Sequence, residues 1–121
     1  MGLPADNRIR RSAEFRHVLS SGQGRGGRAG DRLLLLSAIP NDRSGHRVGL
    51  SVSKRVGGAV VRNRVKRRLR EIFGEIAVAE TGEGDQGWDI VATARPPAAE
   101  ATYEELRTSA ARLVSKVKSR R

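Results

Sequence analysis

The residues best suited to chemistry in this sequence are the cations between Lys54 and Phe73. This stretch reads KRVGGAVVRNRVKRRLREIF and holds eight Lys or Arg side chains against one acid, Glu71. Basic side chains at this density favour an anionic partner over a merely solvated surface, and a basic stripe of this kind is typical of nucleic-acid binding. The stretch therefore predicts a surface that binds phosphate groups.

Helical spacing separates these cations from an apolar stripe. The apolar positions recur at intervals of three or four residues, which is typical of an amphipathic helix: Val61, Val65, Leu69, Ile72 and Ile76. Like charges four residues apart, such as Arg62 and Lys66, destabilise an isolated helix by about 0.2–0.5 kcal/mol per pair. An anionic partner would relieve that repulsion, so the spacing supports the same prediction.

The other reactive side chains do not form a catalytic set. The chain has no cysteine, and its two histidines, His17 and His46, lie in different predicted elements without an accompanying serine and carboxylate. The acids at 80–85 lack the ligand order of a calcium-binding loop. Gly57-Gly58 precedes a helix, but no Lys-Ser/Thr pair of a phosphate-binding loop follows it. We therefore predict no catalytic residue and no metal site on this chain.

The aromatic residues indicate the type of nucleic-acid binding. There are four, Phe15, Phe73, Trp88 and Tyr103, and the predicted strands contain only Trp88. Modules that read single strands by stacking place aromatic rings on an open sheet. Recognition of backbone and shape is therefore favoured over base-specific reading. Binding to DNA stays open on charge alone, although no helix-turn-helix partner or dimerisation heptad accompanies the basic helix.

Composition limits the class of protein. The chain has 121 residues, enough for a single domain over 1–121, and 24 Lys or Arg against 13 Asp or Glu give a net charge of +11. Such a charge attracts polyanions and makes association sensitive to salt. No apolar run approaches the length of a membrane span, and the N-terminus has no apolar signal region. We expect a soluble cytoplasmic protein without a membrane partner.

Apolar spacing and turn residues predict the elements that position these cations. Helices are expected at 12–20, at 59–78 and from Thr102 onward, where Thr102 and Glu105 can form a capping box. Strands are expected at 32–39, 46–53 and 88–94. Residues 1–11 are expected to form a basic extended arm, and the glycine-rich residues 22–30 are by composition a flexible loop.

The connections between strands predict how they pair. A short loop separates the strands at 32–39 and 46–53, so these two are expected to form an antiparallel pair. A long helix connects the strands at 46–53 and 88–94, so this second pair is expected to be parallel. Such crossovers are right-handed in about 98% of cases.

The basic helix and the strand before it closely resemble the protein subunit of bacterial ribonuclease P. The family's arginine–asparagine–arginine signature is matched by GGAVVRNRVKRRLR at 57–70, and RVGLSVSK at 47–54 is similar to its preceding strand. The resemblance extends over about residues 8–117. It implies an α+β fold, a small α/β sandwich like that of ribosomal RNA-binding proteins, with three helices and a mixed sheet of about four strands. It also implies a short edge strand within 22–30 and the rare left-handed crossover.

The resemblance further implies the partners and the reaction. The protein would bind the catalytic RNA subunit of ribonuclease P and the 5′ leader of precursor tRNA, and so promote endonucleolytic removal of the leader. Mg²⁺ would be held mainly by the RNA subunit and the substrate, where the chemistry takes place. No DNA partner is expected. A ribosomal-protein-like rRNA binder and a sequence-tolerant DNA-binding protein stay open as alternatives.

The resemblance implies two sets of site residues. Contacts to RNA are implied for Lys54, Arg55, Arg62, Asn63, Arg64, Lys66, Arg67, Arg68 and Arg70. A cleft for the leader is implied to be lined by Phe15, Leu19, Leu36, Ser51, Arg55 and Ala94. Leu19 and Leu36 stand where the family often has aromatics, so stacking on the leader would be weaker here. Because Phe15 shares a helical face with Val18 and Leu19, core packing of its ring is an open alternative.

Overall fold

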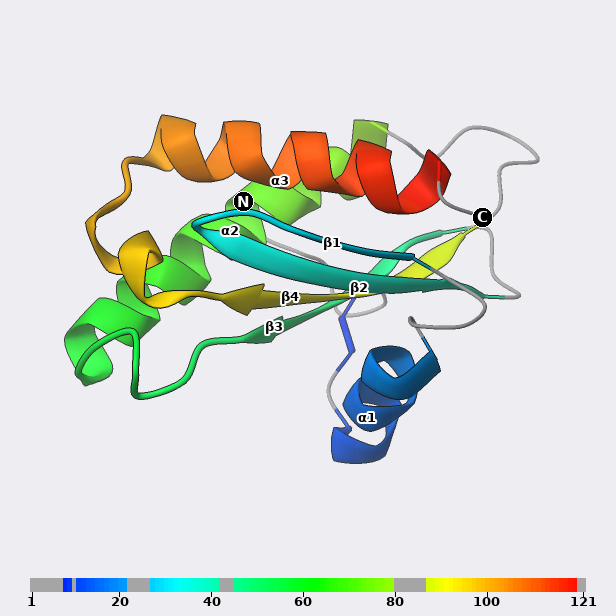
Figure 1. The fold of residues 1–121 in the computed structure, drawn as a ribbon, viewed down its shortest axis with the longest axis horizontal. Coiled ribbons are helices and arrows are strands. Elements are labelled where there is room, and N and C mark those ends of the chain that lie inside the picture. Colours follow the sequence, from blue (N-terminus) through cyan, green and yellow to red (C-terminus); the bar gives the residue numbers. More distant parts are fainter. Residues whose placement is uncertain (1–7, 10, 22–26, 42–44, 80–86, 120–121) are drawn as a thin grey trace.

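A four-stranded sheet separates two layers of helix (Figure 1). The computed structural model describes residues 8–9, 11–21, 27–41, 45–79 and 87–119. Within them the elements follow in this order: α1 (Ser12–Ser21), β1 (Gly27–Gly30), β2 (Leu34–Pro40), β3 (Arg47–Ser51), α2 (Ala59–Ala79), β4 (Trp88–Ala94), the 3-10 helix η2 (Pro96–Glu100) and α3 (Tyr103–Ser119). Helices α2 and α3 cover one face of the sheet, and α1 lies against the other.

The sheet has the strand order β1-β2-β4-β3. Strand β4 pairs antiparallel with β2, with Leu34 opposite Ala94, and parallel with β3, with Arg47 opposite Asp89. The predicted antiparallel pairing of β2 with β3 is therefore wrong. Six of the seven β4 residues are buried, so this strand is apolar enough to be covered on both faces and takes the central place between them.

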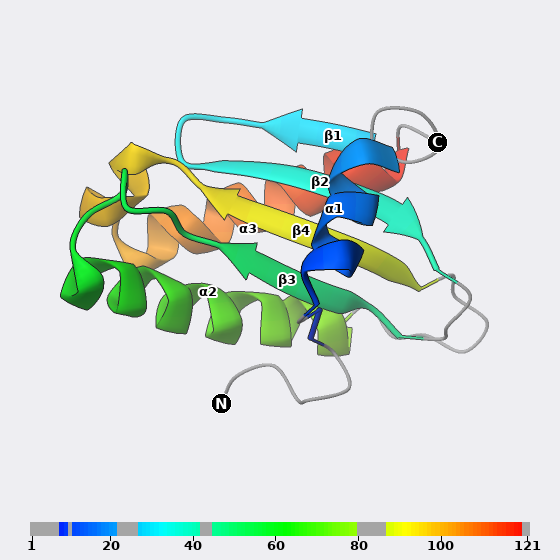
Figure 2. The same ribbon diagram turned by 90° about the horizontal axis from the view of Figure 1, so that it is seen from below.

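The helical crossover from β3 through α2 to β4 joins two parallel neighbours, as predicted. Figure 2 views the sheet from the α1 side, so that α2 lies behind it, and the path from β3 to β4 makes the crossover left-handed. This is the rare hand that the family resemblance implies.

A short edge strand, β1, forms within the glycine-rich stretch and pairs antiparallel with β2. Gly27 lets this strand lie close beneath α3, because a Cβ at this position would lie 2.6 Å from the carbonyl oxygen of Val117. Composition alone predicted a loop here, whereas the resemblance implied the strand. Residues 22–26 lie outside the described part of the chain.

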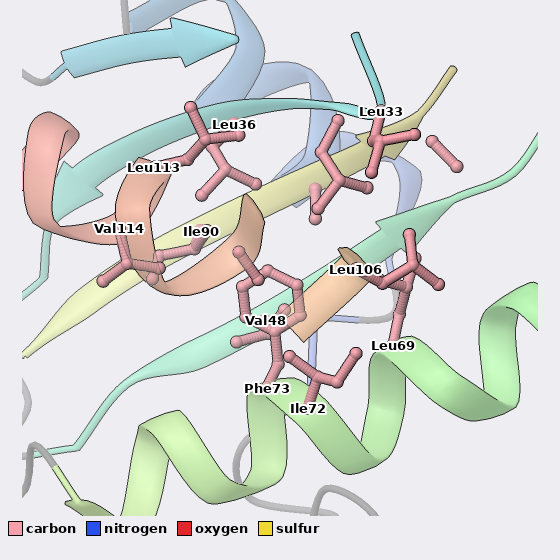
Figure 3. Close-up of a cluster of buried hydrophobic side chains, with 14 of the residues drawn as sticks. Leu33, Leu36, Val48, Leu69, Ile72, Phe73, Ile90, Leu106, Leu113 and Val114 are labelled. Atoms are coloured by element: carbon pink, nitrogen blue, oxygen red, sulfur yellow. The ribbon is translucent and has the colours of Figure 1, made fainter. Parts of the chain in front are cut away.

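The main core lies between the sheet and the α2–α3 layer (Figure 3). Alternate residues of the central strands point into it, among them Leu36 from β2 and Ile90 from β4, and they meet Phe73 from α2 and Leu113 from α3. This layer holds most of the buried apolar side chains and fixes α2 on the sheet.

A smaller core lies on the opposite face, beneath α1. Its buried members are Ile9, Val18, Ile39 and Val91. The N-terminal segment also belongs here, since the Ile9 amide donates to the carbonyl of Val48 over 3.0 Å. The end of the predicted arm is therefore docked on β3. Residues 1–7 and 10 lie outside the described residues, as do residues 80–86.

The start of α3 is fixed by the predicted capping box. The Thr102 amide donates to Oε1 of Glu105 over 2.8 Å, and the Glu105 amide donates to Oγ1 of Thr102 over 3.1 Å. Among the helices of the described residues, none combines the length and apolar character that a membrane crossing requires.

Candidate nucleic-acid interface

Helix α2 carries its cations on two flanks of a buried stripe. Val65, Leu69 and Ile72 form that stripe and face the main core. At 3.6 residues per turn, the flank that adjoins β3 and the flank that adjoins α3 carry different cations. The first flank carries Arg62, Lys66 and Arg70, with Arg67 and the neutral Asn63 beside them on the outward face, and the second carries Arg64 and Arg68.

The flank toward α3 uses its arginines within the protein. Nη2 of Arg64 donates to the carbonyl of Ala99, and Nη1 of Arg68 donates to the carbonyl of Ala101, each over 3.1 Å. Both side chains are half-buried. They therefore tie η2 and the start of α3 to the middle of α2.

The flank toward β3 borders a groove of about 290 Å³. The groove lies between the N-terminal segment, α1, β3 and α2, and its lining residues are Arg8, Ile9, Phe15, Val48, Leu50, Lys66 and Arg70. Leu50 makes an apolar floor, beside the almost fully buried Val48, while Lys66 and Arg70 supply positive charge at the α2 wall. Such a groove suits a chain that has both apolar rings and phosphates.

The ring of Phe15 lies directly on the backbone of β3. A Cβ at Gly49 would lie 2.5 Å from Cζ of this ring, so only glycine allows the ring to approach the strand so closely. Phe15 packs partly against the small core and also lines the groove. Core packing and a place in a groove, the two alternatives that the sequence left open, are therefore both present in part.

Two residues predicted for the cleft lie on the wrong face of the sheet. Leu36 and Ala94 are 0% and 4% exposed and belong to the main core with α2 and α3. Placing them beside Phe15 was wrong, because side chains alternate between the two faces along a strand and these two point away from α1. Leu113 lies beside Leu36 in Figure 3.

The other predicted cleft residues surround the groove without lining it. Leu19 packs half-buried against the small core, Ser51 is half-buried at the end of β3, and Arg55 is exposed in the turn that follows. The lining residues Arg8, Ile9, Val48 and Leu50 were not predicted. The alternation of β3 could have suggested Val48 and Leu50, but nothing local in the sequence indicates that Arg8 and Ile9 dock there.

The remaining cations of this region have no acidic partner in the described part of the chain. Within the described ranges, no carboxylate forms a salt bridge with the following side chains: Lys54, Arg55, Arg62, Lys66, Arg67 and Arg70. Lys54, Arg55, Arg67 and Arg70 are also exposed. Their combined field attracts polyanions to the side of the molecule that contains the groove.

One buried-charge network fixes α1 on the sheet beside the groove. Arg47 donates to Asp89 through Nε over 2.9 Å and through Nη2 over 2.6 Å, and its Nη1 donates to Oε2 of Glu14 on α1 over 2.8 Å. Asn41 supports Asp89 through its side-chain amide over 2.8 Å. The hydrogen bonds to Asp89, followed by those to Glu14, raise the pKa of Arg47, so its charge is permanent and internally neutralised.

The histidines contribute no catalytic pair to this surface. His46 is 2% exposed, and its Nδ1 accepts a hydrogen bond from the Trp88 amide over 3.0 Å, which is a structural role. Over the described residues, no group of three or more His, Cys, Asp or Glu side chains could hold a metal ion. What the described residues of this surface offer a partner is cations, an apolar floor and one ring.

Comparison of the sequence with known families gives a match over residues 3–118 to the family described as Ribonuclease P. The "Ribonuclease P protein component" of Bacillus mycoides (strain KBAB4) is 42% identical over 104 residues, which cover 85% of this chain and 84% of the relative. That of Bacillus cereus (strain ATCC 10987 / NRS 248) is 40% identical over 103 residues, with 85% and 84% covered.

Solved structures show the same fold. The RNase P protein of Staphylococcus aureus superposes with a TM-score of 0.75 at 29% identity and covers 92% of this chain and 96% of its own. The RNase P protein of Thermotoga maritima, in complex with 1-(4-fluorophenyl)-2-thiourea, gives a TM-score of 0.77 at 23% identity, with 92% and 100% covered. At that identity the second likeness supports the fold alone. The predicted α+β fold with three helices and a four-stranded mixed sheet is confirmed.

Proposed function

The chain belongs to the ribonuclease P protein family, and from this premise we propose which of its surfaces meets each RNA of the reaction. As a family member it is part of the endoribonuclease that matures tRNA 5′ ends, and its partner is an RNA subunit. No observation favours the ribosomal-protein-like alternative or a DNA-binding protein.

We assign the RNA subunit to the exposed cations around α2. Lys54, Arg55 and Arg67 are exposed and have no acidic partner among the described residues, and the neutral Asn63 is exposed on the same helix as Arg67, which supports this assignment. Arg62 is half-buried on the same helix. Arg64 and Arg68 each use one N–H on a backbone carbonyl, and a guanidinium has five donors, so both retain donors for phosphate at the border of this surface.

We assign the 5′ leader of precursor tRNA to the groove. The observation that carries this proposal is that the groove joins one aromatic ring, Phe15, to two cations, Lys66 and Arg70, which have no acidic partner among the described residues. A single-stranded leader offers bases that stack on aromatic rings and phosphates that pair with cations. Leu50 and Val48 give the floor against which a stacked base would lie.

The protein's part in the reaction is to bind and orient. Mg²⁺ would be held mainly by the RNA subunit and the substrate, and would assist hydrolysis of the phosphodiester there. In this proposal the groove of the protein holds the leader on one side of the scissile bond, and Lys66 and Arg70 offset the charge of the leader phosphates. No side chain of the protein is assigned a proton transfer.

Replacement of the ring tests the assignment of the leader. Phe15→Leu keeps apolar bulk but removes the stacking face, so in the holoenzyme we expect the affinity for precursor tRNA to fall by about fivefold or more, from a stacking free energy of ~1–3 kcal/mol. The affinity for mature tRNA should not change, and the melting temperature should change little. Equal losses for both tRNAs would contradict a leader site in this groove.

A further inference from the structure

The position of Phe15 depends on how α1 is attached to the sheet. Besides the small core, α1 is held by the ion pair between Glu14 and Arg47. Glu14 directly precedes Phe15 in the same turn of the helix. Any shift at Glu14 therefore moves the ring.

The guanidinium of Arg47 has a fixed orientation. Nε and Nη2 donate to the two oxygens of Asp89, which is a bidentate pair that sets the plane of the group. Asn41 fixes Asp89 in turn. With that plane set, Nη1 points to one place above the sheet, and Oε2 of Glu14 lies there at 2.8 Å.

Arg47 is also connected, along its own strand, to the surface on which the Phe15 ring rests. Gly49, on which the ring rests, lies two residues after Arg47 on β3, and side chains two residues apart point to the same face of a strand. Arg47 thus fixes the helical turn that carries the ring, and its own strand provides the surface beneath the ring.

Arg47 does not belong to the cations that meet RNA. Its side chain is 18% exposed, and two carboxylates, those of Asp89 and Glu14, neutralise it. A contribution to leader binding must therefore pass through geometry.

We propose that Arg47 is a positioning residue for the leader, acting through Glu14 to hold α1 so that the Phe15 ring faces the groove. The inference rests on the proposed function, in which that ring stacks on the leader. A ring that is held in place before binding loses less conformational freedom when the leader binds, which strengthens the complex.

The test uses two substitutions with the same change of charge. Glu14→Ala removes the acceptor for Arg47, whereas Glu14→Gln keeps an amide oxygen in its place. The measured quantity is the ratio of holoenzyme affinities for precursor and mature tRNA, so a general effect of charge on RNA binding cancels. We expect Glu14→Ala to lower this ratio by about three- to tenfold, a part of the stacking effect, and Glu14→Gln to lower it clearly less.

A matched control removes an exposed ion pair elsewhere. Glu104→Ala breaks the contact between Glu104 and Arg107 on α3, at 3.3 Å, and changes the net charge by the same amount. We expect the ratio to stay unchanged in this variant.

A spectroscopic measurement reports the ring itself. The chain has two phenylalanines, and Phe73 is completely buried in the main core. In protein labelled with ¹³C-phenylalanine, we expect Glu14→Ala to shift or broaden the ring resonances of Phe15 and to leave those of Phe73 in place. Unchanged Phe73 resonances also show that the variant is folded.

The outcomes separate the two proposals. If Phe15→Leu does not lower the affinity ratio, the leader assignment itself fails. If Phe15→Leu lowers the ratio but Glu14→Ala changes neither the ratio nor the Phe15 resonances, only the positioning role is overturned. Equal effects of Glu14→Ala and Glu14→Gln would assign the effect to charge and also overturn it.

Discussion

The two flanks of α2 carry the same type of side chain in different surroundings. On one flank Lys66 and Arg70 border an open groove and have no acidic partner among the described residues, whereas on the other Arg64 and Arg68 donate to backbone carbonyls of the segment before α3. A cation therefore takes its role from what lies opposite it. Among the described residues, Lys66 and Arg70 leave all their donors at the groove, whereas Arg64 and Arg68 each use one donor to hold the protein's own chain.

Paired substitutions on the two flanks should give the largest contrast. Arg64→Ala with Arg68→Ala removes two hydrogen bonds from charged groups, and we expect the free energy of unfolding to fall by about 2–4 kcal/mol. Lys66→Ala with Arg70→Ala removes the same net charge without such a bond. The free energy of unfolding of this second double variant should change by less than about 0.5 kcal/mol, since both substitutions are on the surface.

RNA binding should show the opposite contrast. Loss of two phosphate contacts at Lys66 and Arg70 should reduce the slope of log K against log salt by about 1.4–1.8. Replacement of Arg64 and Arg68 should reduce this slope less. Denaturant titrations and salt titrations of the parent and the two double variants check both statements, and equal stability losses for the two pairs would remove the distinction between the flanks.

A smaller change in the free energy of unfolding is expected at Asp31, which binds α3 through Ser109 and Arg112. Asp31 accepts hydrogen bonds from the amides of Leu33 and Leu34, from Ser109 and from Arg112. Burial by itself would raise the pKa of Asp31, but the hydrogen bonds, first among them that of Ser109, outweigh it and lower the pKa from 3.8 to about 2. The ionised carboxylate therefore stabilises the fold above pH 3.8, and this contribution is lost as the pH falls from there to about 2.

Asp31→Asn should lower the free energy of unfolding at neutral pH by about 1–3 kcal/mol, since hydrogen bonds to a charged group are lost. The variant should also lose stability less steeply than the parent between pH 4 and pH 2. The measurement is chemical unfolding at several pH values. RNA affinity should not change, because Asp31 lies against α3 and away from the groove. Parallel pH curves for the two proteins would contradict the role given to this carboxylate.

The smallest expected effect concerns Gly49, the β3 residue on which the Phe15 ring rests. Gly49→Ala places a methyl group where the Phe15 ring lies, so the ring must move, and we expect the affinity for precursor tRNA to fall by about two- to fivefold, a part of the stacking effect. Stability should change by less than about 1 kcal/mol, because alanine favours the strand while the close contact disfavours it. Gly58→Ala is the matched control, since its Cβ meets no atom within 4 Å. Equal affinities for the two variants would show that the ring position does not matter.

The sequence predicted the elements that depend on local patterns. The capping box at Thr102 and the parallel pair of β3 and β4 follow from spacing and connection length, and the structure has them; α2, predicted at 59–78, spans Ala59–Ala79. The order of the sheet was missed because it depends on which strand is covered on both faces. Leu36 and Ala94 were misplaced for a related reason. Which side chains of a strand face α1, and which face α2 and α3, depends on where these helices pack on the sheet.

The contacts of Arg64 and Arg68 lay beyond prediction for another reason. The carbonyls that they bind are 35 and 33 residues away in the sequence, and a backbone carbonyl carries no signature of residue type. The groove residues Arg8 and Ile9 likewise meet Phe15 only through the fold. The identity of the cations was readable from the sequence, but their division into two flanks required the structure.

Cross-linking from the groove and from the flank of α2 toward α3 tests the assignment of the leader most directly. The chain has no cysteine, so a single cysteine can carry a photoreactive group at either Leu50 in the groove or Glu75 on the exposed flank toward α3. With a precursor tRNA labelled in its leader and bound to the holoenzyme, we expect cross-links to the leader from position 50 and none from position 75. Cross-links to the leader from position 75, with none from position 50, would contradict the assignment of the leader to the groove.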